Sequence, residues 1–451
     1  MSMRSMMRGA GLLLIGLVAG SHALEAQTPR PRQSRPVALT GATIHTVTQG
    51  TIQNGTIVLE NGKITAIGAN VAIPAGAERV DVRGRHIYPG LVDGFSAMGL
   101  TEIGAVDVTN DLVEMGPFNP NVRAEVAFNP ESRHIGVARS NGVVVTVTSP
   151  GGGIISGQAA AMMMEGWNWE EMTLKPQAGL IIQWPSLVSR GFGGGGGQPN
   201  EARYEQEIRS LKEAFATARA YRTAEAAIQA GQARPRPTDP RWAAMIPVLD
   251  RQVPVIVHAD DVRQIQDAVA WAEEEGVRLV IRGGRDAPYV ADLLARKQIP
   301  VLVTAVLDSP DREWEAYDAI YSLPAKLHAA GVPFAITGGS SAAYENRLPY
   351  EAGAAMAYGL PEDAAIRAVT IAPAQFLGFG DRVGSLEVGK DATLLVTTGN
   401  PLEYETEVER VFIEGRDVDL MDAHRRFFEK YMEKVRQMGP PNTTPIMGTV
   451  R

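Results

Sequence analysis

The feature that most constrains the fold is a repeated alternation, from about residue 90 to 374, of short Val- and Ile-rich runs with longer helical stretches. The runs are GVVVTV (142–147), PVIVHA (254–259), RLVIRGG (278–284), IPVLVTAV (299–306) and VPFAITGG (332–339). Buried parallel strands read as continuous apolar runs, and strands separated by helices form βαβ units. The pattern therefore predicts an α/β domain with a parallel sheet, either a barrel or a doubly wound sheet.

Short β-branched runs flank this region on both sides. They are VALTGATIHTV, GTIVLENGKITAIG and ERVDVRGRHIYPG before it, and GSLEVGKDATLLVTTGN and VERVFIEGRDV after it. Such runs, separated by turns such as Asn61-Gly62, are typical of a small sheet. The sequence predicts a composite β-sandwich from residues 37–89 and 380–416, with the barrel-sized domain, residues 90–379, inserted between them. An insertion at about 190–245 and a helical tail at 417–451 complete the organisation.

The N-terminal segment, residues 1–26, has the pattern of a secretory signal peptide. Arg4 and Arg8 precede the apolar run GLLLIGLVAG, and small residues follow. This run is too short to span about 30 Å of hydrocarbon. We therefore expect a periplasmic or secreted protein, with no membrane attachment after cleavage of the signal.

Composition excludes several classes of function. The chain has no cysteine, which rules out disulfides, thiolate metal sites and thiol nucleophiles. Its formal net charge is −8, and no Lys/Arg cluster suited to phosphate binding is visible, so no nucleic-acid partner is expected.

The flanking segments and several phrases between them resemble the amidohydrolase superfamily, specifically its imidazolonepropionase-like branch. The phrases are ITAIG followed by RHIYPGLVDG, PVIVHADD, LPYEAGAAMAYGLPEDAAIRAVTIAPAQFLG and DRVGSLEVGKDATLLV. The resemblance covers residues 37–416 and implies a distorted (β/α)₈ TIM-like barrel with the composite β-sandwich. It places the site at the carboxyl ends of the barrel strands. It also implies hydrolysis of cyclic amides or related C–N bonds by water that one or two divalent metals activate.

The metal-ligand positions that the resemblance implies hold residues that cannot bind metal. Phe95 and Ala97 stand where the first strand should supply two histidines, Gly283 replaces a histidine of the sixth strand, and Gly339 replaces the aspartate of the eighth. His258, one of seven histidines, falls on the ligand position of the fifth strand. Catalytic zinc needs about three protein ligands, so we expect no metal and no other cofactor.

Two functional hypotheses follow. In the first, the chain resembles hydrolases of non-peptide C–N bonds but is catalytically degenerate, and acts as an accessory or ligand-binding subunit with Gln183 and Asp260 as substrate-binding residues. In the alternative, it is an active amidohydrolase with a non-standard catalytic set of His258, Asp93 and Arg282. Arg282 would then polarise the carbonyl. A divalent metal such as zinc would be the cofactor only under this alternative.

The C-terminal tail predicts a helix with an apolar stripe and a basic flank. Its apolar members are Phe427, Phe428, Tyr431 and Met432. The stripe either packs on the chain's own barrel or forms an interface. The expected partners are accordingly a second copy of the chain or an active paralogue, besides a small-molecule ligand.

Overall fold

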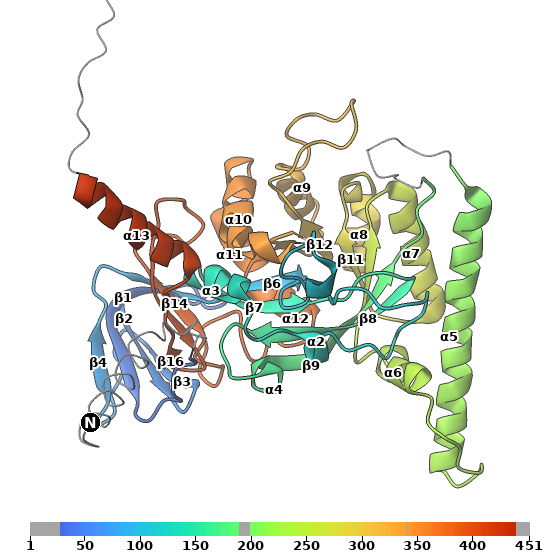
Figure 1. Cartoon of the computed structure of the whole chain (residues 1–451), viewed down its shortest axis with the longest axis horizontal. Coiled ribbons are helices and arrows are strands. Elements are labelled where there is room, and N and C mark those ends of the chain that lie inside the picture. Colours follow the sequence, from blue (N-terminus) through green and yellow to red (C-terminus); the bar gives the residue numbers. More distant parts are fainter. Residues whose placement is uncertain (1–27, 189–198, 340, 439–451) are drawn as a thin grey trace, which may run out of the picture.

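The computed structural model describes residues 28–188, 199–339 and 341–438 as two sheets with surrounding helices (Figure 1). The predicted signal peptide lies outside the described residues. Within the described ranges, no helix combines the length and the apolar character needed to cross a bilayer.

The larger sheet forms a nearly closed barrel. Its strands follow one another in chain order, and the last strand contacts the first. They are β6 (Leu91–Ser96), β7 (Val143–Thr148), β8 (Ile155–Met163), β9 (Thr173–Gln183), β10 (Val255–Ala259), β11 (Leu279–Gly283), β12 (Val301–Thr304) and β13 (Phe334–Thr337). The predicted TIM-like barrel class is thereby confirmed.

One strand departs from the parallel arrangement of a (β/α)₈ barrel. Strand β8 pairs antiparallel with both β7 and β9, whereas the other neighbouring strands from β6 to β13 pair in parallel. Only residues 149–154 separate β7 from β8. A parallel pair needs a crossover of about a dozen residues or more, so this short connection forces the antiparallel direction.

Helices cover the outside of the barrel and also make up much of the long insertion. Those after β10 are α7 (Val262–Glu275), η2 (Ala287–Val290), α8 (Ala291–Lys297), α9 (Leu323–Ala329), η3 (Ala342–Arg347), α10 (Leu348–Ala357), α11 (Glu362–Ala368) and α12 (Ile371–Phe376). Those before it are η1 (Asp107–Thr109), α2 (Ala124–Ala127), α3 (Arg133–Ser140), α4 (Trp169–Met172), α5 (Glu201–Gln229) and α6 (Pro240–Leu249). Helix α5 stands at the end of the molecule away from the small sheet (Figure 1).

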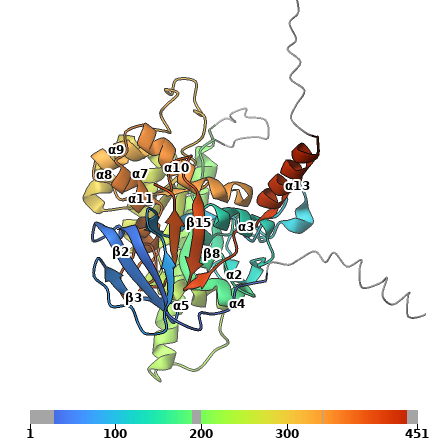
Figure 2. The same ribbon diagram turned by 90° about the vertical axis from the view of Figure 1, so that its left-hand side faces the viewer.

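The smaller sheet takes strands from both ends of the chain, which lie side by side in Figure 2. Its strands are β1 (Val37–His45), β2 (Thr51–Glu60), β3 (Lys63–Gly68), β4 (Glu78–Asp81), β5 (His86–Pro89), β14 (Leu394–Thr397), β15 (Val408–Ile413) and β16 (Arg416–Asp417). Strands β5 and β14 pair antiparallel, from His86 opposite Thr397 to Pro89 opposite Leu394. This pairing joins the N-terminal strands of the sheet to its C-terminal strands.

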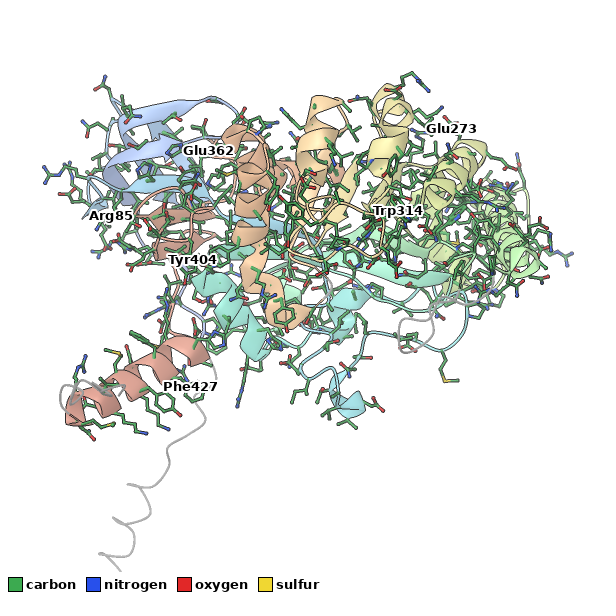
Figure 3. The ribbon with its side chains drawn as sticks, turned by 90° about the horizontal axis from the view of Figure 1, so that it is seen from above. Arg85, Glu273, Trp314, Glu362, Tyr404 and Phe427 are labelled. Carbon is green, nitrogen blue, oxygen red and sulfur yellow. The ribbon has the colours of Figure 1, made fainter. Side chains whose placement is uncertain are left out.

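The tail forms helix α13 (Ala423–Met438), which extends away from the rest of the described chain (Figure 3). Asp422 caps its start by accepting hydrogen bonds from the backbone N–H groups of His424 and Arg425. Phe427 is 56% exposed and Phe428 67% exposed. The apolar stripe therefore does not pack on the chain's own barrel, because none of the helix's residues is buried against the described part of the chain.

Candidate functional site

Three of the predicted site residues meet at the carboxyl ends of neighbouring strands. Gln183, His258 and Arg282 stand in register across β9, β10 and β11, so their side chains share one face of the barrel sheet. His258 Nδ1 lies 3.2 Å from Gln183 Oε1, and His258 Nε2 lies 3.2 Å from Asp260 Oδ2. Both ring nitrogens thus face protein partners, which leaves neither of them free to bind a metal without breaking a contact.

Asp260 occupies space that a side chain at position 283 would need. A Cβ atom on Gly283 would collide with Asp260 Oδ1 and would lie 3.3 Å from His258 Cδ2. Burial alone would raise the pKa of Asp260, but the hydrogen bond with His258, the His258 charge and the backbone N–H of Arg285 hold that pKa below its usual range. Asp260 is therefore a carboxylate whose position depends on the glycine beside it.

Arg282 is a buried cation at the barrel mouth, which is the end of the barrel formed by the carboxyl ends of its strands. Its side chain is 9% exposed, and its guanidinium carbon lies 4.0 Å from the centroid of the Phe95 ring. Burial lowers the pKa of Arg282 to about 10, against the favourable charges of Asp260 and Asp93. The guanidinium Nε is buried without a hydrogen-bond partner among the described residues. A cation over an aromatic face is favourable, but it does not replace the missing hydrogen bonds.

Asp93 belongs to a buried acid pair rather than to this cluster of side chains. Its Oδ1 accepts from the backbone N–H of Phe95 at 3.0 Å, and its Oδ2 accepts from that of Gly338 at 2.7 Å. Its neighbour is Glu345 of η3. Burial and the Glu345 charge raise the pKa of Asp93 well above its usual range. Asp93 is thus a buried carboxyl that two backbone N–H groups hold between strands β6 and β13.

Glu345 is the site-forming residue that the sequence analysis missed. It is fully buried and accepts hydrogen bonds from the hydroxyls of Ser96, at 2.5 Å, and Thr146, at 2.8 Å. Burial raises the pKa of Glu345 to about 7, although those two hydroxyls favour the ionised form. No local pattern could have identified it, because Ser96 is 249 positions away along the chain.

The four ligand positions inferred from the resemblance do not fit a divalent metal. Phe95 and Ala97 are buried apolar side chains, 7% and 5% exposed. Gly283 and Gly339 have φ angles of +94° and +96°, which disfavour any residue with a Cβ. No group of three or more His, Asp or Glu side chains within residues 28–188, 199–339 and 341–438 could hold a metal ion. The donor atoms present therefore do not form the metal centre that the resemblance implies.

Comparison with known proteins agrees with the fold. Residues 250–418 match the model of the Amidohydrolase family. The protein named amidohydrolase tasK, from Hapsidospora irregularis, is 24% identical over 386 residues, which cover 80% of this chain. The chain spans only 39% of the length of that relative.

Solved structures extend the comparison across most of the chain. The crystal structure of an amidohydrolase from Thermotoga maritima MSB8 is 30% identical, with a TM-score of 0.75, over 85% of this chain and 99% of that one. A prolidase complexed with N-methylphosphonate-L-proline shares the fold at 17% identity and a TM-score of 0.53, over 85% of this chain and 99% of its own. On the strength of the match to the Thermotoga protein and of the family model, this chain belongs to the amidohydrolase family.

Proposed function

We propose that this protein is a non-hydrolytic member of the amidohydrolase family that binds a small molecule at its barrel mouth and acts as a ligand-binding or accessory subunit. The observation that carries the proposal is the Arg282 guanidinium, which packs on Phe95 between the strands that would supply metal ligands. Two unit charges 4 Å apart repel by about 4 kcal/mol at an effective dielectric of 20, and a divalent ion doubles this. A metal ion beside Arg282 would be repelled by the guanidinium and would find too few donor atoms to coordinate it.

The remaining polar groups support a binding role. A hydrolase without metal still needs a base within reach of water. Both nitrogens of His258 are engaged by Gln183 and Asp260, and both carboxyl oxygens of Asp93 accept hydrogen bonds from backbone N–H groups. Their arrangement favours a fixed polar surface over a proton relay. We also propose that the chain belongs to the imidazolonepropionase-like branch. We propose further that it is exported and that its ligand is a small molecule.

A second candidate function is hydrolysis without a metal, carried by His258, Asp93 and Arg282. The observation that favours it is the 3.2 Å contact between His258 and Asp260, which would orient the imidazole as a base. Arg282 would then polarise the carbonyl. The same residues thus support both functions, and metal content together with turnover separates them.

The first prediction concerns metal content and activity. Protein purified without chelator is expected to contain well below one equivalent of zinc, iron or manganese by elemental analysis, because catalytic zinc requires about three protein ligands. It should also show no turnover of cyclic amides or N-acyl amino acids. One equivalent of metal with turnover would overturn the proposal. Metal-free turnover that His258→Ala abolishes would establish the second candidate function instead.

The second prediction concerns α13, through which we propose that the chain joins a second copy of itself. Phe427, Tyr431 and Val435 are each more than half exposed. They follow one another at helical spacing, so two such stripes can pack together, with acidic Glu429 and Glu433 opposite the basic side chains of the other copy. Light scattering should show a dimer or larger assembly for the full chain. Removing residues 423–451 should give a folded monomer.

A point-variant pair sharpens this test. Phe427→Ser with Tyr431→Ser should weaken association, because it removes two exposed aromatic rings from the stripe. Lys430→Ser with Lys434→Ser changes the same helix on its charged flank and serves as the matched control. A full-length chain that is monomeric at all concentrations, or association weakened only by the lysine pair, would contradict an apolar interface.

A further inference from the structure

A small cavity opens where the family's ligand side chains are missing. It has a volume of about 190 Å³ and lies at the carboxyl ends of β11, β12 and β13. Its walls include Gly283 and Gly339, the two ligand positions without side chains. A Cβ on Gly339 would meet no atom within 4 Å, so the space at this position is open. The cavity therefore lies beside both glycines, with open space at Gly339, whereas Asp260 occupies the space next to Gly283.

Arg282 lines this cavity as a cation without a hydrogen-bond partner. No hydrogen bond joins its guanidinium to any residue of the described chain, and its Nε is fully buried. Its nearest acids only partly compensate. Asp93 accepts from two backbone N–H groups beside Glu345, and Asp260 is engaged by His258 and the backbone N–H of Arg285. A buried guanidinium with unused donors is costly unless an acceptor reaches it.

The other arginine of the cavity is already neutralised. Arg285 lies 3.6 Å from Asp308, 3.4 Å from Asp311 and 3.4 Å from Glu315. These three carboxylates are held by one guanidinium, with Arg312 also bound to Glu315. Of the two arginines that line the cavity, Arg282 is therefore the one whose guanidinium has no hydrogen bond or ion pair with the described chain, and an anionic group would supply the missing acceptors.

The rest of the wall limits the body of the ligand. Val303, Ile320 and Leu323 contribute apolar side chains, and Thr304 contributes a hydroxyl at the end of β12. The volume is below the roughly 300 to 1,000 Å³ of pockets for drug-sized ligands. Ala305, directly after β12, has a φ of +51°. Such backbone strain in a residue other than glycine is concentrated at binding sites.

We propose that this cavity binds a small carboxylate with a short apolar chain, whose carboxylate oxygens accept two parallel hydrogen bonds from Arg282. The planar guanidinium matches a carboxylate in this geometry. The inference rests on the proposed function, because it requires a barrel mouth without a metal. It adds the chemical class of the ligand.

The test uses isovalerate and its neutral analogue of the same shape, isovaleramide, in calorimetric titration of the full chain. Wild-type protein should bind isovalerate at least about tenfold more tightly than isovaleramide, because charge-assisted pairs are roughly twice as strong as neutral ones. Arg282→Met should lower isovalerate affinity by at least about tenfold and should remain folded, since an apolar side chain of similar volume often replaces a buried charge without loss of stability.

Arg278→Met provides the matched control. Arg278 directly precedes β11 at the opposite end of the same strand, where it donates to the carbonyl oxygen of Phe376. This variant removes the same charge from the chain and should leave isovalerate affinity within about twofold, because it lies outside the cavity. Equal binding of acid and amide, or equal loss in both arginine variants, would overturn the assignment of Arg282. Inorganic phosphate binding more tightly than isovalerate would overturn the assignment to carboxylates.

The same titration with a chelator separates this inference from the proposed function. Isovalerate binding that persists in the presence of EDTA and disappears in Arg282→Met supports the guanidinium as the receptor. Binding that EDTA abolishes, and that Arg282→Met retains, would mean that a metal receives the carboxylate. That outcome would overturn both the inference and the metal-free function, whereas a metal-free protein without isovalerate binding would overturn the inference alone.

Discussion

Gly283→Ala is expected to destabilise the protein by about 3 kcal/mol, from backbone strain of about 1 to 3 kcal/mol and a similar cost of overpacking. The φ of +94° disfavours alanine, and the added Cβ would collide with Asp260 Oδ1. Gly283→His, which would restore the family's residue, should cost at least as much. Urea denaturation followed by circular dichroism measures the change in the free energy of unfolding.

The chain contains its own control for this prediction. Gly339 has almost the same φ, +96°, but a Cβ there would meet nothing within 4 Å. Gly339→Ala should therefore cost only the backbone strain, about 1 kcal/mol. In an Asp260→Ala background, Gly283→Ala should cost less than in the wild-type background, because the colliding carboxylate is gone and only the 3.3 Å approach to His258 Cδ2 remains. Equal costs for the two glycine variants in the wild-type background would show that Asp260 moves aside freely.

Glu345→Gln is expected to change the pH dependence of stability by roughly 3 kcal/mol between pH 5 and pH 8. Burial raises the pKa of Glu345 from 4.5 to about 7, and each pKa unit is worth about 1.4 kcal/mol. A carboxyl with a raised pKa binds more protons in the folded state. Its contribution is complete below pH 4.5 and is lost as the pH rises to about 7. Glutamine is neutral throughout, so the variant gains stability relative to wild type across this range.

The prediction concerns the difference between the two proteins because another group titrates oppositely. Burial, and then the charge of His86, lower the pKa of His45 to about 4. Its contribution is lost as the pH falls from 6.5 to 4, which offsets the Glu345 slope in wild type. His45 is the same in both proteins, so its contribution cancels. Glu345→Gln also removes the charge that raises the pKa of Asp93, and this change adds to the variant's gain in stability at higher pH. A stability difference that stays constant from pH 5 to pH 8 would refute the raised pKa of Glu345.

Local pattern in the sequence was enough to establish the architecture. The runs at 254–259, 278–284 and 332–339 are apolar because parallel strands are covered on both faces, and they became β10, β11 and β13. The Asn61-Gly62 turn joins β2 to β3, with φ angles of +52° and +77°, as such a pair favours in hairpins. Phrases at both ends of the barrel likewise indicated the family. Each of these signals lies within about a dozen neighbouring residues.

The chemistry of the barrel mouth was decided only by the tertiary structure. The pairing of Ser96 with Glu345 joins residues 249 positions apart, and the packing of Arg282 on Phe95 joins different strands. The sequence alone showed that Gly283 and Gly339 lack ligand atoms, but not that Asp260 fills the first space while a cavity opens at the second. The physical reason is that burial, charge compensation and free volume depend on which distant side chains converge, and periodicity along the chain carries no record of that convergence.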